Sequence, residues 1–571
     1  MVRCRFETHY SDLNYLRQRL LESDAVVDVA LITDAIVASD AADLENSFQP
    51  KRYLAYVSSR GLRRERIDRH AAPLTHRRGI MLQQEIDQPI IGAWGPAESR
   101  SSSPGAEPAV KQIARFVSRA DFASIGGDTK LALKRTVLDT IACAVAALGG
   151  EPAKLLREQF REYGGNALCT LIGGGRTSPD QAALLNSVLV RYVDILDTYM
   201  SPGGLCHPSD NFGAVLAAAE MSNRSGRDFL LALAIAYEVQ CRFTEVVPVM
   251  FRGLNHALQL SMSVAAAASR LLDLTPEQTA NAIAIAAADN VSLAVVHVEP
   301  VSHWKGISPG WTGMRALYGT SMAKKGFTGP LGLFEGPNGL NRLFDQTISI
   351  DWTNPALGAS RKTVFKKYSA LVHGQPVIET VLALRSQHRI NPEDVAEVVA
   401  EVFQFAYEIA GGGHFGNKDR PQTKEQADYN LKYLISAALL DGEVGPAQLE
   451  ADRILRRDAQ QLLQRVTVKP CDEFTQRYPQ QLGCRITIKL RDGETFTREQ
   501  TDFEGSATQP LSWERVVEKF HWLCEPFAGD LLRDQIVSAV AHLDEIQTTE
   551  LTALLGRVRP EAFQPRTRKS L

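Results

Sequence analysis

The chain has 571 residues, a formal net charge of −3 at pH 7 and 44% hydrophobic residues. This length exceeds what one hydrophobic core usually holds, so two or three domains are expected. The near-neutral charge argues against a general nucleic-acid binder, because such domains are usually strongly basic. No run of about 18 apolar residues predicts a membrane span. The first twenty residues include Glu7 and Asp12 and lack an apolar stretch, which favours an intracellular protein, cytoplasmic or mitochondrial, that is not secreted.

Residues 1–107 differ in amino-acid composition from the rest of the chain. They are charged, and they end in AESRSSSPGAEP, a stretch rich in Ser, Pro, Gly and Glu that is typical of a linker. We interpret them as an N-terminal extension that is partly helical. Its composition does not distinguish a functional segment from a passive one.

Residues 108–345 carry the apolar spacing of buried helices and almost no strand signal. Three of the expected helices begin with Ser or Thr, followed three residues later by Gln or Asp, which predicts a capping box. The pairs are Ser178 with Gln181, Ser225 with Asp228, and Thr275 with Gln278. This segment therefore predicts a large all-helical domain.

The hydrophobic pattern changes in residues 346–545. DVAEVVAEV contains a β-branched run that predicts a strand, and GCRITIKLRDGETFTREQ alternates apolar and polar residues around Asp492-Gly493, which predicts a hairpin. Helical patterns return near the end of this segment, and those helices can pack back on the helical domain. With residues 546–571 as a C-terminal tail, the predicted fold is mainly α, a large all-helical domain plus a smaller α+β domain.

Residues 194–211, DILDTYMSPGGLCHPSDN, hold the strongest local cluster of polar groups. If the preceding helix continues, Asp194 and Asp197 share a face and both carboxylates point into one cleft. His207 follows, and one of the polar residues 209–211 can cap the next helix, whose free N–H groups favour an anion. A histidine oriented by an aspartate there is suited to proton transfer. An inter-helix loop with a capping histidine is the alternative.

Three further stretches place polar side chains near helix starts. NHALQL places His256 there, and HVEPVSHWKGISPGW holds Lys305 on a glycine- and proline-containing loop, where it suits a carboxylate. KKYSALVHGQPVIE sets His373 and Gln375 at the mouth of a helix. A structural histidine and a solvated lysine are the alternatives at His256 and Lys305.

Several common functional motifs do not stand out. We find no clear HExxH, Walker A, GxGxxG or GxSxG motif, and the eight cysteines form no CxxC pair. Metal, nucleotide and serine-hydrolase chemistry therefore lack support from the sequence. We predict no metal site and no cofactor.

Taken together, these stretches resemble the 2-methylcitrate dehydratase family, also called MmgE/PrpD, and its dehydratase-like branch, over about residues 109–545. The matching blocks include LDTIACAVAALGG, the segment that ends in HPSDN, HWKGISPGWTGMRALYG, LFEGPNGL and ADYNLKYLISAALLDG. The resemblance implies a site between the two domains, cofactor-free lyase chemistry on citrate-like tricarboxylates and a homodimer. No nucleic-acid or membrane partner is expected.

Carried over by motif, the resemblance implies four catalytic residues, and we add four residues expected to bind the substrate. The catalytic set is Asp194, His207, His256 and Lys305, and the substrate-binding set is Asp197, Ser209, His373 and Gln375. This sequence departs from the family pattern in three places. Cys206 stands where glycine is frequent, Leu196 replaces an asparagine, and Tyr429 replaces the histidine of Ala-Asp-His-Ser.

The working hypothesis is dehydration of 2-methylcitrate or a longer 2-alkylcitrate to the corresponding cis-aconitate-type alkene, in propionate or secondary metabolism. His207, oriented by Asp194, would transfer one proton. His256 would transfer the other or donate to the leaving oxygen, and Lys305 would bind a carboxylate. Which histidine is the base stays open. The alternatives are a cis-aconitate decarboxylase-like activity and a non-catalytic member that binds partners.

Overall fold

The computed structural model describes residues 2–6, 53–57 and 107–561. The chain separates into two compact units, Met1–Gly95 and Pro96–Leu571. In the first, β1 (Val2–Phe6) and β2 (Tyr53–Val57) pair antiparallel. Most of the predicted N-terminal extension, including its helical part and its linker, lies outside the described residues.

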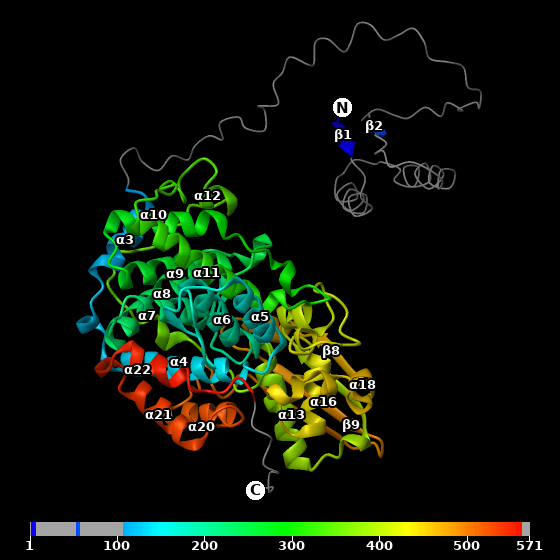
Figure 1. Ribbon diagram of the computed structural model, residues 1–571. Helices are drawn as coiled ribbons and strands as arrows, with labels where there is room; N and C mark the ends of the chain where they lie inside the picture. Colours follow the sequence, from blue (N-terminus) through cyan, green and yellow to red (C-terminus); the bar gives the residue numbers. More distant parts are fainter. Residues whose placement is uncertain (1, 7–52, 58–106, 562–571) are drawn as a thin grey trace, which may run out of the picture. The chain divides into compact units, whose positions relative to one another are not determined.

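The larger core of the second unit is built from helices that come from two separate parts of the chain (Figure 1). The first part contains α3 (Ala109–Arg119), α4 (Gly127–Ala146), α5 (Glu151–Tyr163), α6 (Pro179–Tyr192), α7 (Phe212–Met221), α8 (Gly226–Val246), α9 (Ala257–Leu271), α10 (Pro276–Asp289), α11 (Trp304–Lys324) and α12 (Leu340–Leu343). The second part contains α20 (Trp513–Cys524), α21 (Asp530–Ala541) and α22 (Thr548–Leu555). Two small antiparallel pairs, β3 (Cys169–Thr170) with β4 (Arg176–Thr177) and β5 (Tyr199–Ser201) with β6 (Gly204–Cys206), lie between helices.

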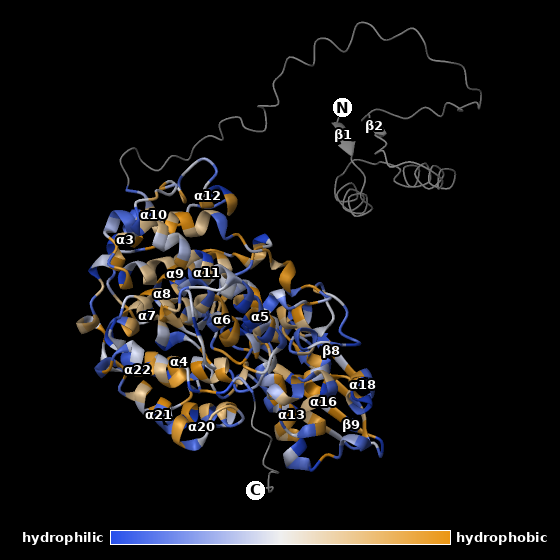
Figure 2. Ribbon diagram, viewed as in Figure 1, coloured by the Kyte–Doolittle hydropathy of each residue, from blue (hydrophilic) through white to orange (hydrophobic). Residues whose placement is uncertain are grey.

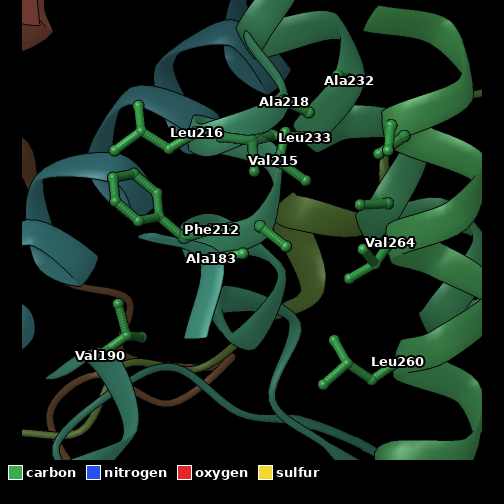
Figure 3. Close-up of a cluster of buried hydrophobic side chains, with 14 of the residues drawn as sticks. Ala183, Val190, Phe212, Val215, Leu216, Ala218, Ala232, Leu233, Leu260 and Val264 are labelled. Carbon is green, nitrogen blue, oxygen red and sulfur yellow. The ribbon is translucent and has the colours of Figure 1, made fainter. Parts of the chain in front are cut away.

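These helices share one hydrophobic core. Figure 3 shows side chains of α6, α7, α8 and α9 meeting there, among them Ala183, Phe212, Leu233 and Val264. Small residues allow close approach: a Cβ atom on Gly213 of α7 would lie 2.4 Å from the backbone nitrogen of Ser187 on α6. The tight α6–α7 contact fixes both ends of the segment that links the two helices.

A smaller core surrounds a four-stranded sheet with the strand order β10-β9-β7-β8. Its strands are β7 (Val395–Val402), β8 (Val466–Pro470), β9 (Cys484–Leu490) and β10 (Thr495–Gln500). Its helices are α13 (Gln375–His388), α14 (Gln404–Ala406), α15 (Lys424–Ala427), α16 (Leu431–Asp441), α17 (Ala451–Ile454), α18 (Arg457–Leu462) and α19 (Asp472–Arg477). The predicted β7 strand and the β9–β10 hairpin are confirmed, and β8 pairs parallel with β7. The predicted mainly α fold class is confirmed.

The C-terminal helices complete the larger core. Helix α20 packs against α4, and the Lys519 ammonium lies 2.5 Å from an oxygen of the Asp139 carboxylate. Helix α22 lies within what we expected to be a tail, because Leu551 and Leu555 form an apolar face that is fully buried. Figure 2 shows hydrophobic residues on the faces where helices meet.

No helix in the described ranges is long and apolar enough to cross a membrane.

Two of the three predicted capping boxes are confirmed, those of Ser225 and Thr275. The third is wrong. Ser178 makes no side-chain cap hydrogen bond, and Gln181 instead contacts the Thr177 hydroxyl and donates to the carbonyl of Gly164. The loop before α6 thus takes up the glutamine that the local pattern assigned to the cap.

Thr275 and Ser178 make a matched pair of test sites, because only the first makes a side-chain cap hydrogen bond. Thr275→Ala should lower the free energy of unfolding by about 1 kcal/mol, because the exposed hydroxyl accepts from the backbone N–H of Gln278. Ser178→Ala should cost less than half as much, because no cap hydrogen bond is lost. Urea denaturation monitored by circular dichroism measures both, and equal losses would contradict the assignment.

Candidate active site

The segment between α6 and α7 folds into a short hairpin and does not extend the helix. Helix α6 ends at Tyr192, and Asp194 adopts a left-handed backbone conformation with φ of 50°. Strands β5 and β6 then pair, which brings Thr198 beside His207. The prediction that Asp194 and Asp197 share one helix face is therefore wrong.

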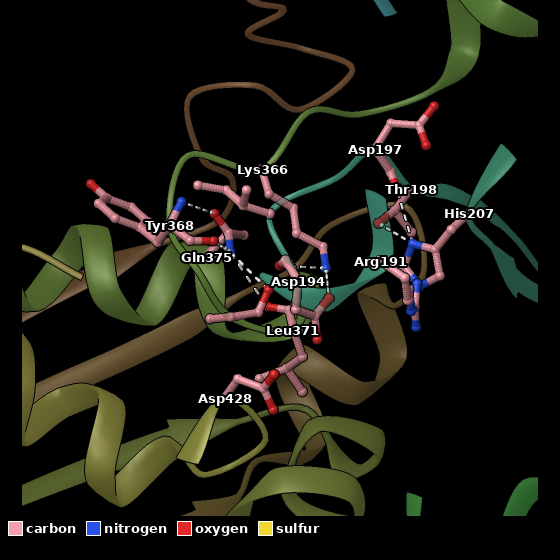
Figure 4. A network of polar contacts seen from close by, with 12 residues as sticks. Arg191, Asp194, Asp197, Thr198, His207, Lys366, Tyr368, Leu371, Gln375 and Asp428 are labelled. Atoms are coloured by element: carbon pink, nitrogen blue, oxygen red, sulfur yellow. Dashed lines mark hydrogen bonds and ion pairs between the residues drawn. The ribbon is translucent and has the colours of Figure 1, made fainter. Parts of the chain in front are cut away.

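Asp194 is a fully buried carboxylate held by two lysines. Its Oδ1 lies 2.5 Å from Nζ of Lys366 (Figure 4). Its Oδ2 lies 3.1 Å from Nζ of Lys305. Lys305 also contacts Asp428 at 2.7 Å. Burial acts to raise the pKa of Asp194, but Lys366, Lys305 and Arg191 outweigh it and hold that pKa well below its usual value. Asp194 is therefore a fixed negative charge that positions cations.

A third lysine supports the same region from the C-terminal helices. The Lys519 ammonium, besides pairing with Asp139, donates to the carbonyl of Ile195 at 2.9 Å and to that of Lys366 at 2.8 Å. It therefore ties the segment after α6 to the segment that carries Lys366.

His207 is oriented by backbone and not by an aspartate side chain. Its Nδ1 lies 2.8 Å from the carbonyl oxygen of Asp197 and 3.2 Å from the Thr198 hydroxyl. A carbonyl only accepts, so Nδ1 carries the proton and Nε2 is left as a basic nitrogen. The expectation that Asp194 orients His207 is wrong, because that carboxylate is occupied by lysines. Figure 4 shows the Asp197 carboxylate turned away from the ring.

The histidine–aspartate pair of the site is formed by His256. Its Nε2 lies 3.3 Å from Oδ2 of Asp210, and Arg191 lies 3.9 Å from the same oxygen. The rings of His207 and His256 meet edge to face with centroids 5.2 Å apart. The carboxylate stabilises the protonated form of His256 more than that of His207, so the two histidines differ in environment.

These side chains surround a small cavity with a volume of about 20 Å³. Its polar lining consists of Arg191, His207, His256, His297, Lys366, His373 and Tyr429. Its apolar lining consists of Leu205, Met250, Leu371, Val372 and Ile409. Lys305 and Asp194 do not line it, but both contact residues that do. The cavity thus joins a cationic, histidine-rich wall to an apolar one.

Burial sets the protonation states in this cavity. The pKa values of His207, His256 and His297 are lowered, first by burial, with Arg191 adding to the effect. Burial also raises the pKa of Tyr429 well above its usual value. The site therefore presents neutral imidazoles and a protonated phenol at neutral pH.

His373 lines the cavity, and neither of its ring nitrogens has a hydrogen-bond partner among the described residues. Its role in binding substrate stays a prediction. Its ring contacts Phe403, Phe405 and Tyr478 edge-on. Burial lowers its pKa to about 3. It stays neutral over the whole range in which enzymes usually work.

The other three predicted substrate-binding residues do not line the cavity. The Asp197 carboxylate accepts from the Tyr237 hydroxyl at 2.8 Å and from the Ser209 backbone N–H at 3.1 Å, and burial raises its pKa to about 6. The Gln375 side chain accepts from the backbone N–H groups of Lys367 and Tyr368. These contacts fix the backbone next to His207 and Lys366, and a direct role in binding substrate stays a prediction.

Two further local expectations are wrong. Residues 208–211 form a 3-10 turn before α7, and Asn211 bonds Gln240 and the carbonyl of Pro208 in place of capping the helix. Lys305 lies in the first turn of α11, which runs through Pro309, and not on a loop before the helix. Proline at this position removes one backbone hydrogen bond from the helix and crowds the carbonyl of Lys305, four residues earlier.

The sequence analysis did not predict four polar residues that line the cavity, Arg191, His297, Lys366 and Tyr429. A signal existed for Arg191, because a single arginine inside the apolar run SVLVRYV of a buried helix requires a partner. None existed for Lys366, because the neighbouring Lys367 carries the same charge and instead pairs with Glu504 at 2.5 Å.

Among the described residues, no group of three or more His, Cys, Asp or Glu side chains is arranged as a metal-ligand set.

Comparison with known families identifies the family of this chain. The MmgE/PrpD N-terminal domain matches residues 111–353, and the MmgE/PrpD C-terminal domain matches residues 368–545. The chain belongs to the MmgE/PrpD family. The resemblance seen in the sequence is thereby confirmed at the level of the family.

Individual MmgE/PrpD relatives carry two kinds of name. Cis-aconitate decarboxylase of Mus musculus is 25% identical over 448 residues, 74% of this chain and 88% of that protein. The cis-aconitate decarboxylase-like protein oryM of Aspergillus oryzae is 25% identical over 78% of this chain and 96% of its own length. The 2-methylcitrate dehydratase of Salmonella typhi is 24% identical over 63% and 78%. The relatives are thus named as lyases of two types.

The free energy of unfolding should fall in acid because His373 is buried. Its pKa is lower in the folded chain than the usual 6.5, so the unfolded chain takes up a proton first as the pH falls. Stability from this group is therefore complete above pH 6.5 and is lost as the pH falls toward 3. Relative to the wild type, His373→Phe should gain about 1.4 kcal/mol of unfolding free energy per pH unit below 6.5.

Urea denaturation at pH 7.5, 6 and 5 measures this difference. His373→Gln serves as the matched variant, because it differs from phenylalanine in shape and polarity but also cannot titrate. The two variants should have different stabilities at pH 7.5 and the same pH slope. A wild-type slope parallel to both would refute the interpretation.

Proposed function

We propose that this chain is a lyase that acts on a tricarboxylate of the citrate or aconitate class within the cavity beside His207. The observation that carries the proposal is the combination of buried cations with neutral imidazoles on one wall. Arg191 and Lys366 line the cavity, and Lys305 lies directly behind Tyr429 with its ammonium 3.6 Å from the ring centre. Guanidinium and ammonium groups bind carboxylates strongly when water is excluded.

The reaction that this wall supports best is dehydration of 2-methylcitrate or a longer 2-alkylcitrate. The proton to be removed lies on a carbon next to a carboxylate, and Nε2 of neutral His207 is available as its base. The leaving hydroxyl needs a proton, and His256 can supply it because a bound trianion and Asp210 both favour its protonated form. The products are water and the alkene, and the proton taken by His207 balances the one given by His256.

Decarboxylation of a cis-aconitate-type acid is the second candidate, and Tyr429 is the observation that favours it. This phenol lines the cavity at the position where the family pattern carries the histidine of Ala-Asp-His-Ser. In that reaction a C–C bond breaks, CO2 leaves, and the electron pair of the broken bond forms a new C=C bond. The original C=C bond becomes a single bond, and its carbon next to a second carboxylate takes up a proton. The relatives named cis-aconitate decarboxylase also match more of the chain, 74–78% against 63%.

A homodimer, which the family resemblance implies, is also a proposal, and we assign its interface to α11. Trp304, Trp311 and Tyr318 are 44%, 40% and 61% exposed and lie seven residues apart, on one face of the helix. The centroids of the Trp304 and Trp311 rings lie 6.0 Å apart. Aromatic side chains are enriched at the centres of interfaces, and a two-fold axis lets one stripe pair with its own copy.

Product analysis tests the reaction. The purified chain is incubated with citrate, 2-methylcitrate, longer 2-alkylcitrates and cis-aconitate, and mass spectrometry reads loss of water or of CO2. We expect loss of water from an alkylcitrate. His207→Ala should lower turnover at least about a hundredfold, because a general base is removed.

Two controls accompany this assay. His388→Ala changes an exposed histidine outside the cavity and should leave turnover unchanged. Tyr429→His restores the family residue and should raise the ratio of dehydration to decarboxylation. Release of CO2 from cis-aconitate with no loss of water from any citrate would establish the second candidate, and no turnover of any of these acids would refute both.

The dimer is tested by light scattering coupled to size exclusion. Wild type should elute at twice the chain mass, and Trp311→Glu/Tyr318→Glu should shift it toward the monomer, because charges at an interface centre are costly. Phe327→Glu, an exposed aromatic residue off this stripe, is the control. A dimer that persists in the double variant would exclude α11 as the interface.

A further inference from the structure

The contact between Asn255 and His297 fixes where the histidine carries its proton. Oδ1 of Asn255 accepts from the backbone N–H of Ala257 at 3.0 Å, so the other atom of the amide is Nδ2, a donor. Nδ2 lies 2.9 Å from Nε2 of His297. An amide donor needs an acceptor, so Nε2 is unprotonated and the proton of the neutral ring is on Nδ1.

The Nδ1–H group of His297 has no hydrogen-bond partner among the described residues. The ring is 3% exposed and lines the cavity. It stacks flat on Tyr429, with centroids 5.5 Å apart and an angle of 6° between the planes. A buried donor without an acceptor is unfavourable, so a cavity occupant that accepts this hydrogen bond gains affinity.

The surroundings keep this ring uncharged. Burial lowers the pKa of His297, and the nearby Lys305 lowers it further. The Lys305 ammonium itself lies over the ring of Tyr429, the residue on which His297 stacks. Three side chains thus form a stack in which the cation is already paired with Asp194 and Asp428, and the imidazole has the donor that remains unused.

We propose that His297 is a substrate-binding residue that donates a hydrogen bond from Nδ1 to one carboxylate of the tricarboxylate, and that Asn255 is a positioning residue that holds it in this tautomer. This inference rests on the proposed function. It makes His297 a neutral donor of the site and leaves His207 as the base, so these two imidazoles have opposite roles because different partners fix their protons.

Asn255→Asp is the decisive variant. It preserves the shape and the acceptor for Ala257, but it replaces the donor that faces Nε2 with an acceptor. The neutral ring must then place its proton on Nε2, and Nδ1 turns a lone pair toward the substrate. At pH 8 the dissociation constant of tricarballylate, an inert tricarboxylate, should rise about ten- to a hundredfold in calorimetric titration.

The pH dependence separates this effect from a general structural one. As the pH falls, the introduced carboxylate favours a doubly protonated ring, which donates from both nitrogens. Tricarballylate affinity of Asn255→Asp should therefore recover between pH 8 and pH 6, relative to the wild type measured under the same conditions. Damage to the fold would not be repaired by acid.

Two substitutions of His297 provide the matched comparison. His297→Phe keeps a ring to stack on Tyr429 but removes the donor, and it should weaken tricarballylate binding by a similar factor. His297→Asn can place an amide N–H near the position of Nδ1, and it should retain more affinity than phenylalanine does. Circular dichroism melts show which variants are folded, and Asn255→Asp carries the test if His297→Phe does not fold.

The outcomes distinguish this inference from the proposed function. Wild-type binding that is lost in Asn255→Asp at pH 8 and regained at pH 6 supports it. Equal tricarballylate binding by wild type, Asn255→Asp and His297→Phe overturns the role of His297 and leaves the lyase proposal standing. A wild type that neither binds tricarballylate nor turns over any tricarboxylate overturns both.

Discussion

The site depends on one buried carboxylate. Asp194 follows the last turn of α6, and its two oxygens hold lysines from α11 and from the segment before α13. Each of these charges would be costly to bury alone, and removing one partner of such a group leaves the others uncompensated. The pairing therefore fixes three distant parts of the chain relative to one another, and the cavity is the space left between them.

This arrangement also explains why the histidines are neutral. The cations are held by carboxylates that do not line the cavity. Their positive charge adds to burial in lowering the pKa values of the imidazoles. Of the four histidines that line the cavity, only His256 directly contacts a carboxylate of the described residues, that of Asp210. Environment thus separates the imidazoles into a base, a group that can be charged and a neutral donor, as expected where titratable groups divide acid and base work.

Local rules were sufficient for much of the fold. Apolar spacing predicted the helices, Asp492-Gly493 marked the hairpin, and Ser225 and Thr275 marked two helix starts. The same rules failed at Asp194, where they extended α6 too far. A left-handed aspartate is unfavourable in isolation, and the two lysines that stabilise it are more than 110 residues away in sequence.

The candidate site was predicted in its members more than in its contacts. Motif order brought His207 and His256 together, and the structure places both in one cavity. It could not show that backbone orients His207, or that Lys366 points inward and Lys367 outward, because adjacent residues with the same charge differ only in tertiary contacts. Arg191 was missed although a lone arginine in an apolar helix is a visible anomaly.

Lys519 has a consequence for how the chain is made. It joins α20 to Asp139 of α4, 380 residues earlier, and also fixes the carbonyls of Ile195 and Lys366. During synthesis, helices α3 to α11 leave the ribosome long before this ammonium exists, so the nascent larger core stays open at α4. Loop closure over such a span is slow, and these contacts of the pocket form only after residue 519 has been synthesised. A chain that ends before residue 519 would lack the ammonium that pairs with Asp139 and fixes the carbonyls of Ile195 and Lys366.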